Sequence, residues 1–154
     1  QPGYRGLPVL LKASINDFVL LWSLFEAKML SDGERRTQIE KIELFVQNNG
    51  ESFGPVDELE AHLEYFSRRY VKEGRFTDSY QILNPSRDSK GIISPTLLRG
   101  SENELGVVHC LLLISMCLRN NFVHGVKWTS GIEDQQGNFE RASAIFYWAM
   151  CRVS

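Results

Sequence analysis

A run of apolar residues, Leu111–Leu118, constrains the fold of this chain more than any other stretch. It continues into the polar stretch Arg119-Asn-Asn-Phe-Val-His-Gly125. Apolar residues recur along both stretches at a helical spacing of about 100° per residue, and a helix this apolar has to be buried. The sequence therefore predicts one long buried helix that starts at Ser101 or Asn103 and runs to about Val123.

Three polar residues close to the end of this helix fall on one side of it, away from its most apolar face. They are Arg119, Asn120 and His124. Asn120 and His124 are four residues apart, so their side chains can meet, and Gly125 suits the left-handed conformation of a helix C-cap. Cationic side chains near a helix C-terminus often interact only with the helix dipole. The spacing alone therefore leaves a functional site and a simple helix cap both open.

The helix is also apolar on the side opposite the predicted core face. One or two turns before the polar residues, that side carries Leu112, Leu113 and Met116. A helix that is apolar all round is buried on both sides. We expect the core of the chain to cover one side and a second copy of the protein to cover the other. Such a two-fold dimer would bring two Arg/Asn/His sets close together.

The remaining helices can be placed from apolar periodicity and from turn residues. They are expected at about 14–30, 34–48, 57–72 and 139–152, which gives an all-α helical bundle of about five helices with no convincing strand. Residues 1–13 are expected to be irregular, 126–138 to form a polar loop, and 74–101 to form a long loop with short elements near Ser79–Leu83 and Thr96–Leu98. The length of 154 residues indicates a single domain.

Glu26 falls inside the apolar stripe of the first predicted helix. A carboxylate at such a position is costly unless it is paired or protonated. The side chain could escape to solvent at the helix end or form a purely structural ion pair. Alternatively it could hold an arginine of the functional site, for which Arg119 is the candidate.

The overall charge limits how the chain could bind a nucleic acid. The formal net charge is −2, so any contact with RNA must be local rather than spread over the surface. Arg68 and Arg69 cluster at the end of the third predicted helix. A solvated helix C-terminus is the favoured interpretation of this cluster, and a patch that contacts phosphates is the alternative.

The three cysteines, Cys110, Cys117 and Cys151, are odd in number and lie in apolar surroundings. They are therefore expected to be buried free thiols in a reducing compartment, which favours a cytoplasmic protein. Neither the cysteines nor the histidines have the spacing of metal ligands, so we expect no metal and no cofactor. No run of about 18 apolar residues is evident, so no membrane span is expected.

The polar stretch also resembles a known motif. Arg119-Asn-Asn-Phe-Val-His124 matches the R-x4-H motif of the HEPN superfamily, in the common form in which Asn follows the Arg. Gly125 and the following Val126-Lys127 are similar to the context of that motif. The resemblance implies a helical HEPN-like fold and a metal-independent endoribonuclease whose site is a composite of two subunits. Some HEPN domains only bind nucleotides or partner proteins, which is the alternative function.

Such a site could cleave RNA because the substrate carries its own nucleophile, the 2′-OH. His124 would move a proton near neutral pH, and Arg119 would stabilise charge on the phosphate. Asn120 would orient His124 or bind a phosphate oxygen, and Asn121 and Lys127 are weaker candidates for substrate contacts. The products would carry 2′,3′-cyclic phosphate and 5′-OH ends. A toxin or an anti-phage defence effector, restrained by an antitoxin or regulatory protein, is one expected role.

Overall fold

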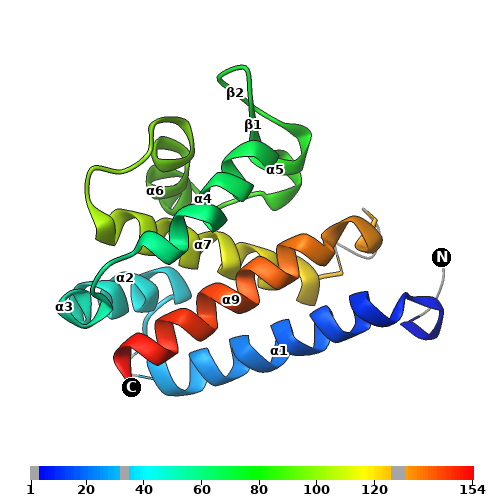
Figure 1. Cartoon of the computed structure of the whole chain (residues 1–154), viewed down its shortest axis with the longest axis horizontal. Coiled ribbons are helices and arrows are strands. Elements are labelled where there is room, and N and C mark those ends of the chain that lie inside the picture. Colours follow the sequence, from blue (N-terminus) through cyan, green and yellow to red (C-terminus); the bar gives the residue numbers. More distant parts are fainter. Residues whose placement is uncertain (1–3, 32–34, 126–130) are drawn as a thin grey trace.

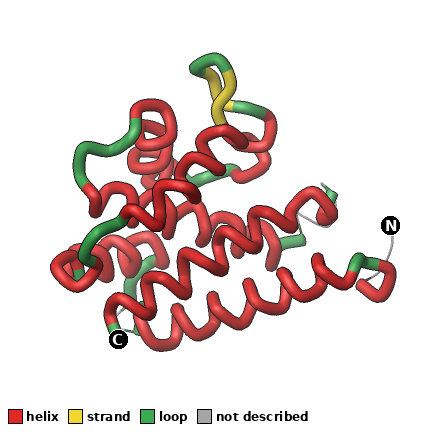
Figure 2. The backbone as a smooth tube through the Cα atoms, in the orientation of Figure 1, coloured by secondary structure: helices red, strands yellow, loops and turns green. Residues whose placement is uncertain are grey.

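The computed structural model describes residues 4–31, 35–125 and 131–154. Helices dominate these residues, so the predicted all-α class is confirmed (Figure 2). The elements in chain order are η1 (Tyr4–Gly6), α1 (Val9–Met29), α2 (Gln38–Asn48), α3 (Gly50–Phe53), α4 (Asp57–Tyr70), β1 (Val71–Lys72), β2 (Arg75–Phe76), α5 (Asp78–Leu83), α6 (Arg87–Arg99), α7 (Glu104–Val123), η2 (Ile132–Gln135) and α9 (Gln136–Val153).

The predicted long helix corresponds to α7, which lies in the middle of the fold (Figure 1). α1 and α9 lie side by side and run in the same direction, and α7 packs against α9 from behind. On its other side α7 contacts α2, α4, α5 and α6. Asn103 starts α7 as predicted, because its side-chain Oδ1 accepts the backbone N–H of Leu105 at 2.9 Å. Gly125 follows the helix with a φ of +77°, the left-handed conformation expected of it.

The apolar side of α7 that was expected to meet a second copy is instead covered by this chain's own helices. Leu112 and Leu113 are both 0% exposed and Met116 is 3% exposed. The sequence does not reveal this cover because most of α6 was assigned to a loop. The burial removes the argument for a dimer through these three residues.

Much of the predicted loop over 74–101 is regular structure, since it contains β2, α5 and α6. The short element expected near Ser79–Leu83 is confirmed as α5, whereas the one expected near Thr96–Leu98 is the end of the longer α6. Gly91 and Pro95 lie inside α6, and both are poor helix formers, so they obscure the helical pattern. Burial of Ile93 and Leu97 against the core outweighs that cost. Ser86 also caps α6, since its hydroxyl accepts the Ser89 N–H at 3.3 Å.

Several element boundaries also differ from the expected ones. The first helix begins at Val9 rather than near residue 14, since Leu11 is buried and Pro8 suits the position before a helix. The third helix ends at Tyr70 because Val71–Lys72 pairs with Arg75–Phe76 in a short antiparallel hairpin. This hairpin departs from the expected absence of strands. The last helix begins at residue 136 rather than 139, and 126–130 of the predicted polar loop lie outside the described residues.

The environments of the cysteines agree only in part with expectation. Cys110 and Cys117 are buried on α7, and burial raises the pKa of each thiol to about 12. Cys151 is exposed near the end of α9, so the expectation that it is buried is wrong. All three are free thiols.

By length and composition alone, α7 is apolar enough to cross a membrane. This helix, Glu104–Val123, contains an 18-residue window with a mean hydropathy of 1.4, but 61% of that window is buried inside the fold. A central helix of a packed bundle passes the same test. The composition of α7 is therefore explained by its place in the core.

Leu112→Ala should lower the free energy of unfolding by about 2–5 kcal/mol, because it leaves a cavity in the most buried helix. Urea denaturation with a constant m-value would measure the loss. Leu98→Ala is a matched control, since Leu98 is 40% exposed on α6. A loss for Leu112→Ala no larger than that of the control would contradict the placement of α7.

Candidate functional site

The last turn of α7 carries the motif residues to the surface. Arg119 and Asn120 are half-buried and His124 is exposed. The His124 backbone N–H donates to the Asn120 carbonyl at 3.0 Å, which continues the helical pattern by one residue. His124 therefore lies one turn beyond Asn120 on the same side of the helix, as the spacing predicts.

An aromatic residue of α7 fixes this turn on the core. The ring of Phe122 lies edge-on to Phe18 of α1, with 6.3 Å between centroids, and edge-on to Phe139 of α9 at 5.6 Å. These contacts hold the helix end against two other helices. The orientation of the polar residues on the same turn follows from that anchor.

The guanidinium of Arg119 is held by an aromatic face and an amide. Its Cζ lies 5.3 Å from the centroid of the Trp22 ring, and its Nη1 donates to Asn120 Oδ1 at 3.1 Å. Trp22 is 3% exposed, so the surface beneath the guanidinium is rigid. Within the described ranges, Arg119 forms no ion pair with a carboxylate. Most of its five N–H donors therefore remain available to a ligand.

Arg119 lines a cavity of about 350 Å³ between α1, α2 and α7, which we name the arginine cavity. Trp22 and Glu26 line it from α1 and Lys41 lines it from α2. Two cations thus face one carboxylate, and the cavity is locally positive in a chain whose net charge is negative. Such a cavity is suited to an anion.

Glu26 and Arg119 reach the same cavity, although the predicted ion pair between them is not formed. Glu26 Oε2 is buried and has no hydrogen-bond partner among the described residues. The structure therefore brings together the two residues that the sequence analysis paired. Trp22 and Asn120, rather than Glu26, make the contacts that fix Arg119.

Trp22 and Lys41 were not recognised as site residues from the sequence. Trp22 was read only as part of the apolar stripe of the first helix, and no motif surrounds Lys41. Both reach Arg119 only in the folded chain, in which α1 and α7 pack on α9 and α2 packs on α7. The only available signal was a tryptophan four residues before an acidic residue on one helix face.

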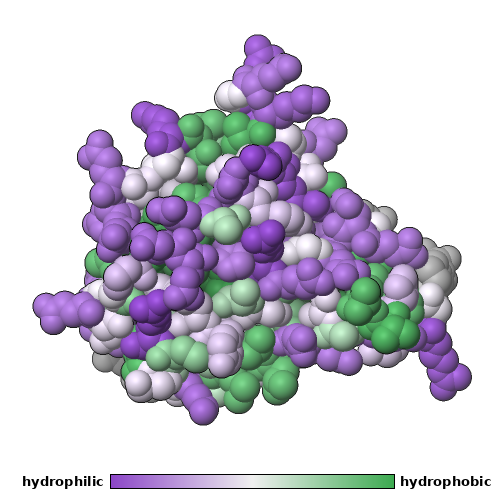
Figure 3. Space-filling view, in the orientation of Figure 1, coloured by the Kyte–Doolittle hydropathy of each residue, from purple (hydrophilic) through white to green (hydrophobic). Residues whose placement is uncertain are grey.

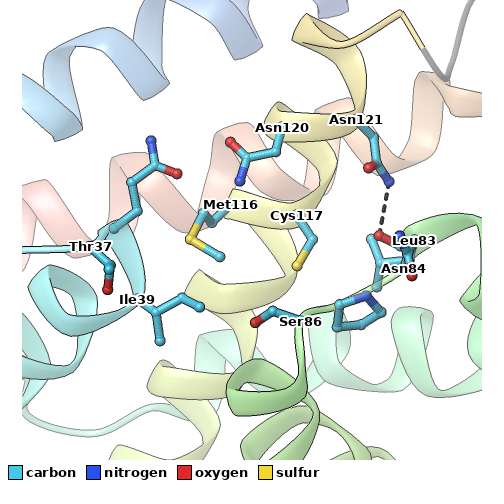
Figure 4. Close-up of a pocket in the computed structure, with 11 residues that line it drawn as sticks. Thr37, Ile39, Leu83, Asn84, Ser86, Met116, Cys117, Asn120 and Asn121 are labelled. Carbon is cyan, nitrogen blue, oxygen red and sulfur yellow. Dashed lines mark hydrogen bonds between the residues drawn. The ribbon is translucent and has the colours of Figure 1, made fainter.

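Asn120 also lines a second cavity, of about 450 Å³, which we name the amide cavity (Figure 4). Its walls come from α7, from the start of α2 and from the connection between α5 and α6. Asn121 lies at its edge and donates Nδ2 to the carbonyls of Ile82 and Leu83, at 3.0 and 2.9 Å. Asn121 thus ties α5 to α7, and its amide donors are already occupied.

His124 lines neither of these cavities, and the structure does not bring the other candidate residues to them. Arg68 pairs with Glu64 and Arg69 pairs with Asp134 at 3.1 Å. Both arginines line a different cavity, between α4 and α9. Lys127 lies outside the described residues.

The other two histidines have packed surroundings that disfavour their charged form. Burial lowers the pKa of His62, as does the neighbouring Arg141, whose Nη1 lies 3.3 Å from His62 Nδ1. Burial also lowers the pKa of His109. His124 is exposed, at the end of the helix that carries Arg119. It is the histidine best placed to exchange protons with a ligand there.

In the parts of the chain that the structure describes, no group of three His, Cys, Asp or Glu side chains could hold a metal ion. Comparison of the chain with protein-family models, with curated proteins and with solved structures gives no match. What the site can do therefore has to be argued from its own geometry.

Asn120→Asp should weaken binding of an anionic oligonucleotide probe at low salt by about tenfold or more. A carboxylate beside Arg119 would occupy the donors on which an anion depends. Fluorescence anisotropy with the labelled probe would measure the affinity. Asn16→Asp adds the same charge on the exposed surface of α1 and should bind the probe nearly as wild type does. Equal effects of the two substitutions would contradict a specific anion site at Arg119.

Proposed function

We propose that this chain is a metal-independent endoribonuclease with an HEPN-like fold, whose site contains Arg119, Asn120 and His124. The observation that carries the proposal is the state of Arg119, which is fixed on Trp22 without a carboxylate partner among the described residues, five residues before the exposed His124 at the end of α7. A fixed guanidinium fork with free donors is well suited to a phosphate. The motif at the end of the central helix is the second support.

In the proposed reaction, His124 accepts the proton of the RNA 2′-OH. The 2′-oxygen attacks the adjacent phosphorus, and the bond from phosphorus to O5′ breaks as O5′ takes up a proton. Arg119 stabilises the charge that develops on the phosphate oxygens. Asn120 keeps Arg119 in place through its Oδ1 and can donate its Nδ2 to a phosphate oxygen. The products carry a 2′,3′-cyclic phosphate and a 5′-OH. A cytoplasmic location of the protein belongs to the proposal, since that is where an RNA substrate would be found.

A two-fold dimer belongs to the proposal, since a second His124 could protonate O5′ while the first accepts the 2′-OH proton. The surface that fits a second copy is on α1 rather than α7. Exposed apolar side chains gather along α1 at the lower edge of Figure 3. They are Val9, Leu10, Val19, Leu20 and Leu24.

The charges on α1 suit a two-fold contact of that kind. Asp17 and Lys28 are exposed and fall within about 20° of each other around α1, Asp17 near its middle and Lys28 in its last turn. When two α1 helices pack antiparallel about a two-fold axis that passes midway between these residues, Asp17 of each copy faces Lys28 of the other. The arginine cavity adjoins this stripe, because Ser23 and Ala27 of α1 line it.

Substitutions of His124 and Arg119 should impair the protein in different ways. His124→Ala should slow cleavage in EDTA by about 100- to 10,000-fold through loss of proton transfer, with RNA affinity largely kept. Arg119→Ala should weaken both RNA binding and turnover, and Arg119→Lys should restore them only in part because it lacks the bidentate fork. Single-turnover rates and anisotropy would separate the two effects, and thermal unfolding would confirm that each variant is folded.

Three outcomes of those measurements would contradict the proposal. Cleavage activity that EDTA abolishes and Mg²⁺ restores would rule out a metal-independent mechanism. Wild-type activity in His124→Ala would remove its proposed proton transfer. Nucleotide binding without any turnover would favour a non-catalytic binding module.

Leu20→Asp combined with Leu24→Asp should shift the protein from dimer to monomer, because it places carboxylates in the centre of the proposed contact. Sedimentation at micromolar concentration would measure the change. Leu98→Asp, at an exposed apolar position on α6, is the control. A wild-type protein that sediments strictly as a monomer would rule out this part of the proposal.

A further inference from the structure

The amide cavity is lined only by uncharged residues within the described part of the chain. Ile39, Met116 and Cys117 form an apolar floor, and the last two are 3% and 5% exposed. Gln38, Asn84 and Asn120 lie around that floor. A charged ligand would find no counter-ion here, whereas a neutral ligand with one apolar face and a polar edge would be matched on both.

The polar groups around the cavity divide into those that the fold uses and those that it leaves available. The hydroxyls of Thr37 and Ser86 accept backbone N–H groups at the starts of α2 and α6. The side-chain amides of Gln38 and Asn84, however, make no hydrogen bond to any residue that the structure describes. The Asn120 Oδ1 accepts from Arg119, which leaves its Nδ2 as a donor.

Amide groups around an apolar floor suit a particular class of ligand. Each amide offers a donor and an acceptor side by side, and the edge of a nucleobase presents donors and acceptors in the same way. The floor offers two sulfur atoms, which make favourable contacts with aromatic rings. Figure 4 shows Met116 and Cys117 between the α2 residues on one side and the α5–α6 residues on the other.

We propose that the amide cavity binds one unpaired nucleobase of the RNA substrate, next to the phosphate that Arg119 holds. Asn120 joins the two sites, because it lines the amide cavity and bonds to Arg119 at 3.1 Å. A base in the cavity would place the neighbouring phosphate near the guanidinium. This inference rests on the proposed function and deepens it, since Gln38 and Asn84 would then determine which base lies beside the cleaved bond.

Free nucleosides test the base pocket without any dependence on cleavage. Adenosine, guanosine, cytidine and uridine carry no phosphate, so their binding should not need Arg119. Two-dimensional NMR titration of the full chain should show one or two of them binding at the amide cavity. Gln38→Ala and Asn84→Ala should each weaken that binding by about 2- to 12-fold, the contribution of hydrogen bonds between uncharged groups. Arg119→Ala should leave it unchanged.

Gln47→Ala is the matched control, because it removes an exposed amide from α2 at a distance from the lining residues. The same variants should then be compared in cleavage of oligonucleotides that differ only in the base beside the cut. Gln38→Ala and Asn84→Ala should reduce the discrimination between bases, and Gln47→Ala should preserve it.

The outcomes separate this inference from the proposed function. One outcome is cleavage that depends on His124 while no nucleoside binds at the amide cavity and base preference is unchanged in Gln38→Ala and Asn84→Ala. This outcome would overturn the inference and leave the proposed ribonuclease activity in place. A second outcome is nucleoside binding that Gln38→Ala and Asn84→Ala both weaken, in a protein that cleaves no RNA. This outcome would support base binding at the amide cavity and overturn the proposed ribonuclease activity. Nucleoside binding that Gln38→Ala, Asn84→Ala and the control Gln47→Ala weaken equally would also overturn the inference.

Discussion

The contact between Arg119 and the buried face of Trp22 is the interaction on which the site depends. A guanidinium at the edge of a core would usually be held by a carboxylate, which would also neutralise it. Here the aromatic face and one amide oxygen, from Asn120, provide the fixed position without removing the charge. The contact exists only because α1 and α7 both pack against α9, and that packing depends on the burial of α7. The stability of the central helix and the electrostatics of the site are therefore linked.

Placement of the cations matters more here than their number. The chain carries 17 Lys and Arg against 19 Asp and Glu, so its overall field does not attract a polyanion. Several arginines are neutralised by neighbouring carboxylates, as Arg69 is by Asp134 and Arg152 by Glu58. The arginine cavity differs in having Lys41 and Arg119 against the single carboxylate of Glu26. A local excess of positive charge beside an uncharged cavity suits a ligand that is anionic at one end and neutral at the other, as a nucleotide is.

The sequence predicted the helix that carries the motif far better than the helices that cover it. The boundaries of α7 could be predicted because its periodicity is unbroken and Asn103 and Gly125 mark its ends. α6 was missed because Gly91 and Pro95 interrupt the local signal, and its stability comes from burial that only the folded chain shows.

The same limit applies to the site. Arg119, Asn120 and His124 could be placed together because they share one helix, whereas Trp22, Lys41 and the amide cavity depend on contacts between helices. The error about Leu112, Leu113 and Met116 has the same origin, since a missed helix left a buried face looking uncovered.

The chemical nature of the RNA ends made by the wild-type protein tests the central claim most directly. The protein would be incubated with a defined oligonucleotide in EDTA, and the ends would be identified by mass spectrometry. Attack by the 2′-OH with proton transfer through His124 predicts 2′,3′-cyclic phosphate and 5′-OH ends. Products with 3′-OH and 5′-phosphate ends would mean that water, rather than the substrate's own hydroxyl, is the nucleophile, and would contradict the account.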